Sequence, residues 1–395
     1  MLHTNTNVRE NERMKFEPFV VSVPQSTLDD LKARLARTRW PDEIEGAAWD
    51  YGANLTYLKK LADYWLNGFD WRAQEKLLNS FPHFRAEIDG LNIHFIHQRG
   101  RGPKPLPLII THGWPSTFFE MHKIIPMLAD PGAHGGEPTD AFDVVAPSLP
   151  GYGFSDAPRK RGWTSLKTAD LWTKLMSGVL GYERFAAHGG DVGAGVTGRL
   201  GLLHPEGVVG IHVTAVVPPY LGPGSSPLTA AELEYVEVQQ SWEREEDGYG
   251  HIQGTRPQTL AYGLNDSPVG LAAWIVEKFR AWSECGGDVE RSFTKDELLT
   301  NVTLYWATQT INSSIRHYYE SRHNPQPFTK GVKITVPCGI CLTTEPVDRC
   351  PREWAERSYG DIRRFTLLPR GGHFAALEAP SVLAEDIRAF FRSLR

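Results

Sequence analysis

The stretch that decides the fold is Phe185-Ala-Ala-His-Gly-Gly-Asp-Val-Gly-Ala-Gly195. An apolar segment runs into a turn in which Gly189, Asp191 and Gly193 have the spacing Gly-x-Asp-x-Gly, and a helical pattern follows. In a sharp turn between a strand and a helix, the flanking residues must be small because the chain is crowded there. The central side chain then stands near the positive N-terminus of the next helix. We therefore predict that Asp191 is a nucleophile, although a helix-capping aspartate after a plain glycine turn would give a similar pattern.

The residue type at position 191 restricts the chemistry. Serine is the usual nucleophile at such a turn, where it attacks carbonyl carbon. A carboxylate suits displacement at saturated carbon, which leaves the substrate attached to the protein as an alkyl ester. Asp191 therefore points to the opening of an epoxide or the cleavage of a carbon–halogen bond.

Strands and helices alternate on both sides of this turn. The expected strands are 92–97, 106–111, 143–147, 185–189, 208–214, 332–342 and 365–368. Helical patterns cover 165–180 and 192–203, and an amphipathic helix ends the chain. Such alternation predicts a mostly parallel sheet with helices on both faces. Together with the turn at Asp191, it predicts the α/β-hydrolase fold.

The alternation stops between about 220 and 330, where the sequence is aromatic-rich and helical. We interpret this stretch as a helical cap inserted into the core. The expected domains are a disordered tail at 1–15, an N-terminal helical meander at 16–95, the core at 96–220 and 331–395, and the cap at 221–330. The meander has apolar side chains at helical spacing, such as Leu28, Leu31 and Leu35, and we expect it to wrap around the core.

A candidate oxyanion hole lies in the segment HGWP, which follows the expected strand 106–111. In this fold, the loop after that strand donates one backbone N–H group, here from Trp114. The residue after the nucleophile, Val192, donates the other. Together they would bind the negative oxygen that forms when water attacks an ester.

The general base of the fold follows the last strand and precedes the last helix, which places it at His373. His373 would deprotonate the attacking water. A carboxylate after the strand that ends near Leu342 should fix its tautomer, and both Glu345 and Asp348 are available there.

From Phe16 to Arg395 the sequence resembles the microsomal-type epoxide hydrolases, as a soluble, bacterial-style member without the membrane anchor. The motifs that carry the resemblance are HGWPSTFFE, PSLPGYGFSDAP, HGGDVGAGV, GGHFAALEAP, LKARLARTRWPDE in the meander and IQGTRPQTLAYGLNDSPVGLAAWIVEKFRAW in the cap. The resemblance implies conversion of an epoxide and water to a vicinal diol through a covalent aspartyl ester.

The resemblance also implies two cap tyrosines that hydrogen-bond the epoxide oxygen. The first precedes IQGTRPQT and is Tyr249, and the second follows a Ser-Ser pair and falls on Tyr318, with Tyr319 as its rival. A neutral phenol can polarise the oxygen and then supply a proton to the leaving alkoxide. Tyr249, Tyr318 and Trp114 are therefore expected to contact the substrate.

One departure from the family affects the orienting acid. The family has an acid after an aromatic-Pro-x run, whereas this chain has TTEPVD. An ungapped comparison with the family places Pro346 at the position where the acid is expected. A shift of one residue favours Glu345 over Asp348.

Composition and charge argue against several other functions. The chain of 395 residues has a net charge of −5 and no lysine-arginine block, so we expect no nucleic-acid partner. It has no apolar run of about 18 residues, which predicts no transmembrane helix. The polar start lacks the apolar core of a signal peptide, so we expect a cytoplasmic protein.

The sequence predicts no metal, nucleotide or redox cofactor. Cys338 and Cys341 form a CxxC, but they lie in an apolar run typical of a buried strand, whereas a redox pair normally begins a helix. None of the glycine-rich stretches has the pattern GxxxxGK of a phosphate-binding loop.

Two alternative functions stay open at this point. A haloalkane dehalogenase would share Asp191 and His373, but it often has a tryptophan directly after the nucleophile, where this chain has Val192. A non-catalytic ligand-binding protein on the same fold often loses the nucleophile, the histidine or the acid. The expected partner is a small apolar or aromatic epoxide, and the meander could mediate a homodimer.

Overall fold

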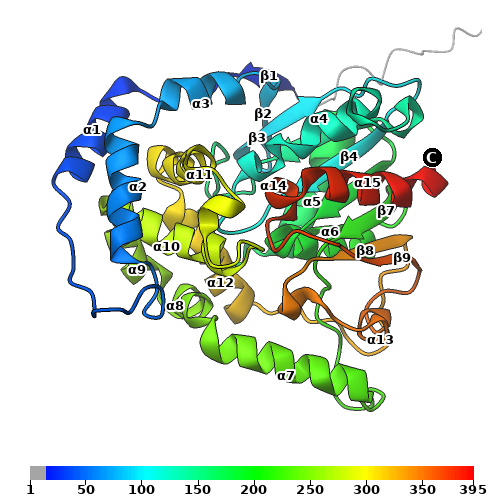
Figure 1. Cartoon of the computed structure of the whole chain (residues 1–395). Coiled ribbons are helices and arrows are strands. Elements are labelled where there is room, and N and C mark those ends of the chain that lie inside the picture. The colour runs from blue at the N-terminus through cyan, green and yellow to red at the C-terminus, as the bar shows by residue number, and fades with distance from the viewer. Residues whose placement is uncertain (1–14) are drawn as a thin grey trace, which may run out of the picture.

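The computed structural model describes residues 15–395 (Figure 1), so the predicted tail lies, apart from Lys15, outside the described residues. Within that range, nine strands form one sheet in the order β1-β2-β3-β5-β4-β6-β7-β8-β9. Their bounds are β1 Phe16–Phe19, β2 His83–Ile88, β3 Leu91–Gln98, β4 Leu106–Thr111, β5 Phe142–Pro147, β6 Phe185–Gly189, β7 Val208–Val213, β8 Cys338–Leu342 and β9 Ile362–Leu367. Every neighbouring pair from β5 to β9 is parallel, whereas β1, β2 and β3 pair antiparallel. The predicted mostly parallel sheet is confirmed.

Both faces of the sheet are covered by helices, because alternate side chains of each buried strand point to opposite sides. Leu108 and Ile110 of β4 belong to one apolar cluster, with side chains of α4 (Ile124–Ala129) and α15 (Pro380–Phe391). Ile109 belongs to the other, with side chains of α5 (Ser165–Thr173) and α6 (Asp191–Leu203). The predicted helix 165–180 continues past α5 as a π-helical turn over Lys174–Val179.

Six helices lie between β7 and β8, in the stretch 221–330 for which the sequence predicts a cap. They are α7 Ala230–Glu245, α8 Gly248–Thr255, α9 Pro257–Asp266, α10 Pro268–Ala281, α11 Lys295–Thr308 and α12 Ile311–His323, all within the described part of the chain. Figure 1 shows them, green to yellow, beside the sheet. Two of them, α7 and α11, begin with a Thr-Glu capping box that satisfies free N–H groups at the helix start.

The N-terminal meander contains α1 (Gln25–Ala36), α2 (Leu55–Asn67) and α3 (Trp71–Leu78), and α1 and α2 lie along the cap (Figure 1). The indole N–H of Trp65 donates to the Thr303 hydroxyl of α11 at 3.0 Å, and Tyr64 donates to Asp296 at 2.8 Å. The meander therefore ties the cap to the core. It also supplies β1 and β2 to the sheet, which the helical prediction did not include.

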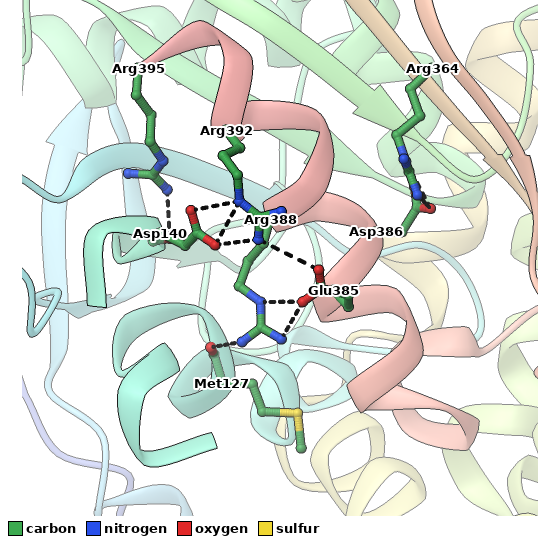
Figure 2. A network of polar contacts seen from close by, with 8 residues as sticks. All are labelled: Met127, Asp140, Arg364, Glu385, Asp386, Arg388, Arg392 and Arg395. Atoms are coloured by element: carbon green, nitrogen blue, oxygen red, sulfur yellow. Dashed lines mark hydrogen bonds and ion pairs between the residues drawn. The ribbon is translucent and has the colours of Figure 1, made fainter. Parts of the chain in front are cut away.

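The chain end that follows α15 is fixed to the core by charged groups (Figure 2). Arg392 forms an ion pair with the buried carboxylate of Asp140 at 2.5 Å, and Arg395 donates to the Asp140 carbonyl oxygen at 2.5 Å. Within α15, Arg388 binds Glu385, three residues earlier, at 2.7 Å. Two shorter helices, α13 (Arg352–Glu356) and α14 (Ala375–Glu378), flank β9.

Among the helices of residues 15–395, none has both the length and the apolar character needed to cross a lipid bilayer.

Candidate active site

Apart from the two cap tyrosines, the predicted catalytic residues follow four parallel strands at their carboxyl ends. The loop with Trp114 follows β4, Asp191 follows β6, the turn with Glu345 and Asp348 follows β8, and His373 follows β9. Because these strand ends meet at one edge of the sheet, side chains far apart in the sequence converge there.

Asp191 lies in the strained turn that the sequence predicts. Its φ is 50°, in the left-handed region that few residues other than glycine adopt. A Cβ atom at Gly193 would lie 2.0 Å from the carbonyl oxygen of Thr111, and one at Gly189 would lie 2.2 Å from that of Gly193. Glycine at both positions therefore allows the close approach that holds Asp191 above the sheet.

The two carboxylate oxygens of Asp191 have different neighbours. The backbone N–H of Trp114 donates to Oδ1 at 2.8 Å. Oδ2 lies 3.7 Å from Nε2 of His373. Val192 follows Asp191 in the first turn of α6 and lines the cavity beside it. Oδ1 thus accepts a hydrogen bond from the backbone, while Oδ2 faces His373.

His373 is held by the cap as well as by its own loop. Its backbone N–H donates to the carbonyl oxygen of Trp282 at 2.8 Å, and the two rings lie 5.2 Å apart between centroids. Burial lowers the pKa of His373, but the surrounding carboxylates outweigh burial, so the pKa lies above its ordinary value. From the largest effect on this pKa to the smallest, the carboxylates are Asp191, Asp348, Glu120 and Glu345.

The two candidate acids both lie beside His373 without a direct ion pair to it. Among the described residues, Asp191 is the carboxylate whose oxygen comes within 4.0 Å of a His373 ring nitrogen. Asp348 accepts a hydrogen bond from the Thr343 hydroxyl at 2.8 Å, and burial raises its pKa. Burial, and then the charge of Asp348, raise the pKa of Glu345 to about 7.

Two cap tyrosines lie against Trp114, whose backbone N–H binds Asp191. Tyr249 of α8 stacks on Trp114 with ring centroids 5.2 Å apart, and Tyr318 of α12 meets Tyr249 edge-on at 5.8 Å. Burial, followed by the charge of Asp191, raises the pKa of Tyr249 above its ordinary range. Burial is also the main cause of the raised pKa of Tyr318. Tyr319, by contrast, stacks on His323 at 3.9 Å.

Two residues near the site had no assigned chemistry in the sequence analysis. Trp282, at the end of α10, contacts both His373 and Tyr249, and nothing in its local sequence separates it from the other cap tryptophans. Glu120, the last residue of the motif HGWPSTFFE, accepts a hydrogen bond from the Ser116 hydroxyl. Burial raises the pKa of Glu120 to about 7.

The described residues contain one cluster with metal-ligand chemistry, formed by His212, Cys341 and Asp386. Asp386 already pairs with Arg364 at 2.6 Å, as Figure 2 shows, and accepts from the Thr366 hydroxyl at 3.0 Å. Its carboxylate is thus satisfied by protein groups, and we assign the cluster a structural role.

Comparisons with known proteins agree with this geometry. The family described as "Epoxide hydrolase N terminus" matches residues 16–121, and the "Alpha/beta hydrolase family" matches residues 108–386. Epoxide hydrolase 1 of Sus scrofa is 40% identical, over 96% of this chain and 89% of the relative. The chain belongs to the epoxide hydrolase family. Juvenile hormone epoxide hydrolase 2 of Ctenocephalides felis is 36% identical, over 94% of this epoxide hydrolase and 84% of the relative.

Solved structures show the same fold along the chain. The crystal structure of juvenile hormone epoxide hydrolase from Bombyx mori has a TM-score of 0.86 at 30% identity, and it covers 98% of this epoxide hydrolase and 96% of that chain. The Aspergillus niger epoxide hydrolase has a TM-score of 0.83 at 32% identity, with 96% of each chain covered. The predicted α/β-hydrolase fold and epoxide hydrolase function are confirmed.

Proposed function

We propose that this epoxide hydrolase forms its covalent ester on Asp191 and hydrolyses that ester with His373. The observation that carries the proposal is that the two Asp191 oxygens have different neighbours. The N–H of Trp114 donates to Oδ1, and Oδ2 faces His373. An oxygen held by an N–H donor is already where negative charge develops during ester hydrolysis.

In the first step, the hydroxyls of Tyr249 and Tyr318 donate to the epoxide oxygen. Oδ2 of Asp191 attacks a ring carbon, the carbon–oxygen bond of the ring breaks, and a tyrosine proton passes to the alkoxide. The raised pKa of both phenols keeps them protonated, and therefore able to donate, at neutral pH.

In the second step, His373 removes a proton from water, and the oxygen of that water attacks Cγ of Asp191. The backbone N–H groups of Trp114 and Val192 bind the oxyanion. The ester bond then breaks, and the leaving alkoxide takes the proton from His373. The proton left on the Asp191 carboxyl returns to the tyrosinate, and a vicinal diol is released.

We propose that Asp348 orients His373, with Glu345, the acid favoured from the sequence, as the competing candidate. Two observations support Asp348. Its charge raises the pKa of His373 more than that of Glu345 does, and the Thr343 hydroxyl fixes its carboxylate. A fixed carboxylate can hold one tautomer of the imidazole and stabilise the imidazolium.

The substitution His373→Gln tests the base directly. It leaves the first step possible and blocks the second, so the ester should accumulate. Mass spectrometry of the variant mixed with styrene oxide should then show a gain equal to one substrate, located in the peptide that contains Asp191. The exposed His134→Gln serves as control and should turn over normally. Normal diol release by His373→Gln would remove His373 from the mechanism.

We also infer a cytoplasmic location. It is supported by the four cysteines, Cys285, Cys338, Cys341 and Cys350, which are all buried free thiols, as expected in a reducing compartment. Fractionation of the source cells tests this, and recovery in a secreted fraction would contradict it.

We further infer that the meander contributes to a homodimer. The support is its exposed apolar side chains, since Ile44 is 63% and Tyr51 is 83% exposed. Light scattering should give twice the chain mass, and Tyr51→Glu should lower it; the mass of a single chain for the unaltered protein would contradict the inference.

A further inference from the structure

The carboxylate of Glu378 is bound to the loop that carries His373. It accepts the backbone N–H groups of Gly372 and Phe374, the two neighbours of His373 in the chain, at 3.1 and 3.0 Å. Glu378 is the last residue of the short helix α14, four residues after Phe374. One side chain therefore holds the backbone of the proposed base on both sides.

The same carboxylate extends to the cap. Oε2 of Glu378 also accepts the backbone N–H of Glu284, in the segment after α10, at 2.8 Å. The carboxylate of Glu284 in turn accepts the N–H of Gly371 at 2.6 Å. The N–H of His373, as described above, donates to the carbonyl oxygen of Trp282. These hydrogen bonds run in both directions and join the loop of the base to the cap.

The loop and the cap segment also lie backbone against backbone. A Cβ atom at Gly372 would lie 2.6 Å from the carbonyl oxygen of Trp282 and 2.9 Å from the backbone nitrogen of Glu284. Both distances are far shorter than an ordinary contact between non-bonded atoms. Glycine at position 372 thus allows the close approach, and a shift of the cap segment would displace the loop.

The contacts of Glu378 go beyond those of a helix cap. Phe374 is the N-cap residue of α14, so the hydrogen bond from its N–H resembles half of a capping box. The other two donors, Gly372 and Glu284, lie outside α14, and Glu284 belongs to the cap. Burial raises the pKa of Glu378, and the three backbone N–H groups offset this in part because they favour the charged carboxylate.

We propose that Glu378 is a positioning residue for ester hydrolysis, which keeps His373 within reach of the ester by holding its loop to the cap. The role rests on the proposed function, because it assumes that His373 is the base. Water must lie between the imidazole and Cγ of Asp191, and a displacement of about 1 Å can slow such a step about 100-fold. Ester formation does not use His373, so the loss of Glu378 should slow the second step selectively.

The test follows both steps in single turnovers of styrene oxide by excess enzyme, as formation and decay of the ester in the mass spectrum of quenched samples. Glu378→Gln keeps the shape, but one acceptor oxygen is replaced by an NH2 group that cannot accept an N–H. Ester hydrolysis should slow about 10- to 100-fold, while ester formation should stay within about twofold of the unaltered rate. Glu378→Asp keeps the charge but is shorter by one methylene, so it should also slow hydrolysis.

The matched control is Glu75→Gln. Glu75 of α3 is also a buried carboxylate that accepts a backbone N–H from another segment, that of Val23 at 2.6 Å, but it lies in the meander. This variant should lose thermal stability without a selective loss of ester hydrolysis. Glu284→Ala removes the exposed acceptor of the Gly371 N–H and should slow hydrolysis by a smaller factor than Glu378→Gln.

Unchanged ester hydrolysis in Glu378→Gln would overturn the positioning role. Equal slowing of both steps would overturn it too, as would a normal rate in Glu378→Asp or the same selective loss in Glu75→Gln. If Glu378→Gln does not fold, Glu284→Ala decides, and normal hydrolysis by that variant counts against the role. His373→Gln separates the two proposals, because a trapped ester in that variant, beside normal hydrolysis in Glu378→Gln, removes the positioning role and leaves the mechanism intact.

Discussion

The protonation states of the three groups around the substrate decide how the rate depends on pH. His373 must be neutral to take a proton from water, and the nearby carboxylates hold its pKa above the ordinary value of about 6.5. In the ester, Asp191 is uncharged, so the charges of Asp348, Glu120 and Glu345 remain to raise the pKa of His373. Ester hydrolysis should slow about tenfold per pH unit below the pKa that His373 has in that state. Ester formation should keep its rate up to about pH 10, because the phenols have raised pKa values. Stopped-flow profiles of the two steps between pH 5 and 10 check this, and a hydrolysis rate that stays constant down to pH 5 would contradict the role of His373.

Two single substitutions distinguish Asp348 from Glu345 as the acid that orients His373. Asp348→Asn should slow ester hydrolysis by on the order of 10²–10⁴-fold, because His373 loses the group that holds its tautomer. Glu345→Gln should slow it much less, since its charge has the smaller effect on His373. Single-turnover decay of the ester in both variants measures the difference. The reverse order of effects would assign the role to Glu345.

Much of the site could be predicted at this scale, for a physical reason. The tight turn requires glycine at fixed spacing around Asp191, so the sequence carries a strong signal there. The acid has no such requirement, because a carboxylate on a loop can reach the same histidine from more than one position. Glu120 and Trp282 were missed because their roles arise from interactions with Asp191 and His373, respectively, each more than 70 residues away along the chain.

Among the elements, the packing of the chain end after α15 depends on the buried carboxylate of Asp140. Asp140 is 1% exposed and is bound by Arg392 and by the hydrogen bond of Arg395 to its carbonyl (Figure 2). Asp140→Asn should lower the free energy of unfolding by about 1–3 kcal/mol, since it weakens hydrogen bonds to a charged group. Urea denaturation measures this, with the exposed Glu137→Gln as control. Equal stability of the two variants would show that the ion pair contributes nothing.

The errors in predicting elements follow from local chemistry. The hairpin of β2 and β3 turns at Asp89 and Gly90, with φ values of 53° and 77°, which is the typical Asp-Gly turn of two-residue hairpins. That signal was present in the sequence but lay inside a segment interpreted as helical. The predicted strand 332–342 was too long, because Pro337 has no N–H to donate and β8 begins only at Cys338.

At the scale of the whole molecule, the proposed active site needs residues from both the core and the cap. Asp191, Trp114 and His373 come from the core, whereas Tyr249, Tyr318 and Trp282 come from cap helices more than 50 residues away along the chain. The inserted cap was predictable because the alternation of strands and helices visibly stops there. How the meander braces the cap, through Trp65 and Thr303, was not predictable, because that contact joins residues 238 apart.

The measurement that most directly tests the covalent route is a single turnover of styrene oxide by excess enzyme in water enriched in oxygen-18. The account predicts that the heavy oxygen enters the peptide containing Asp191, while the first diol carries one oxygen from the epoxide and one from the carboxylate. Heavy oxygen in the first diol and none in that peptide would contradict it, because water would then attack the epoxide directly.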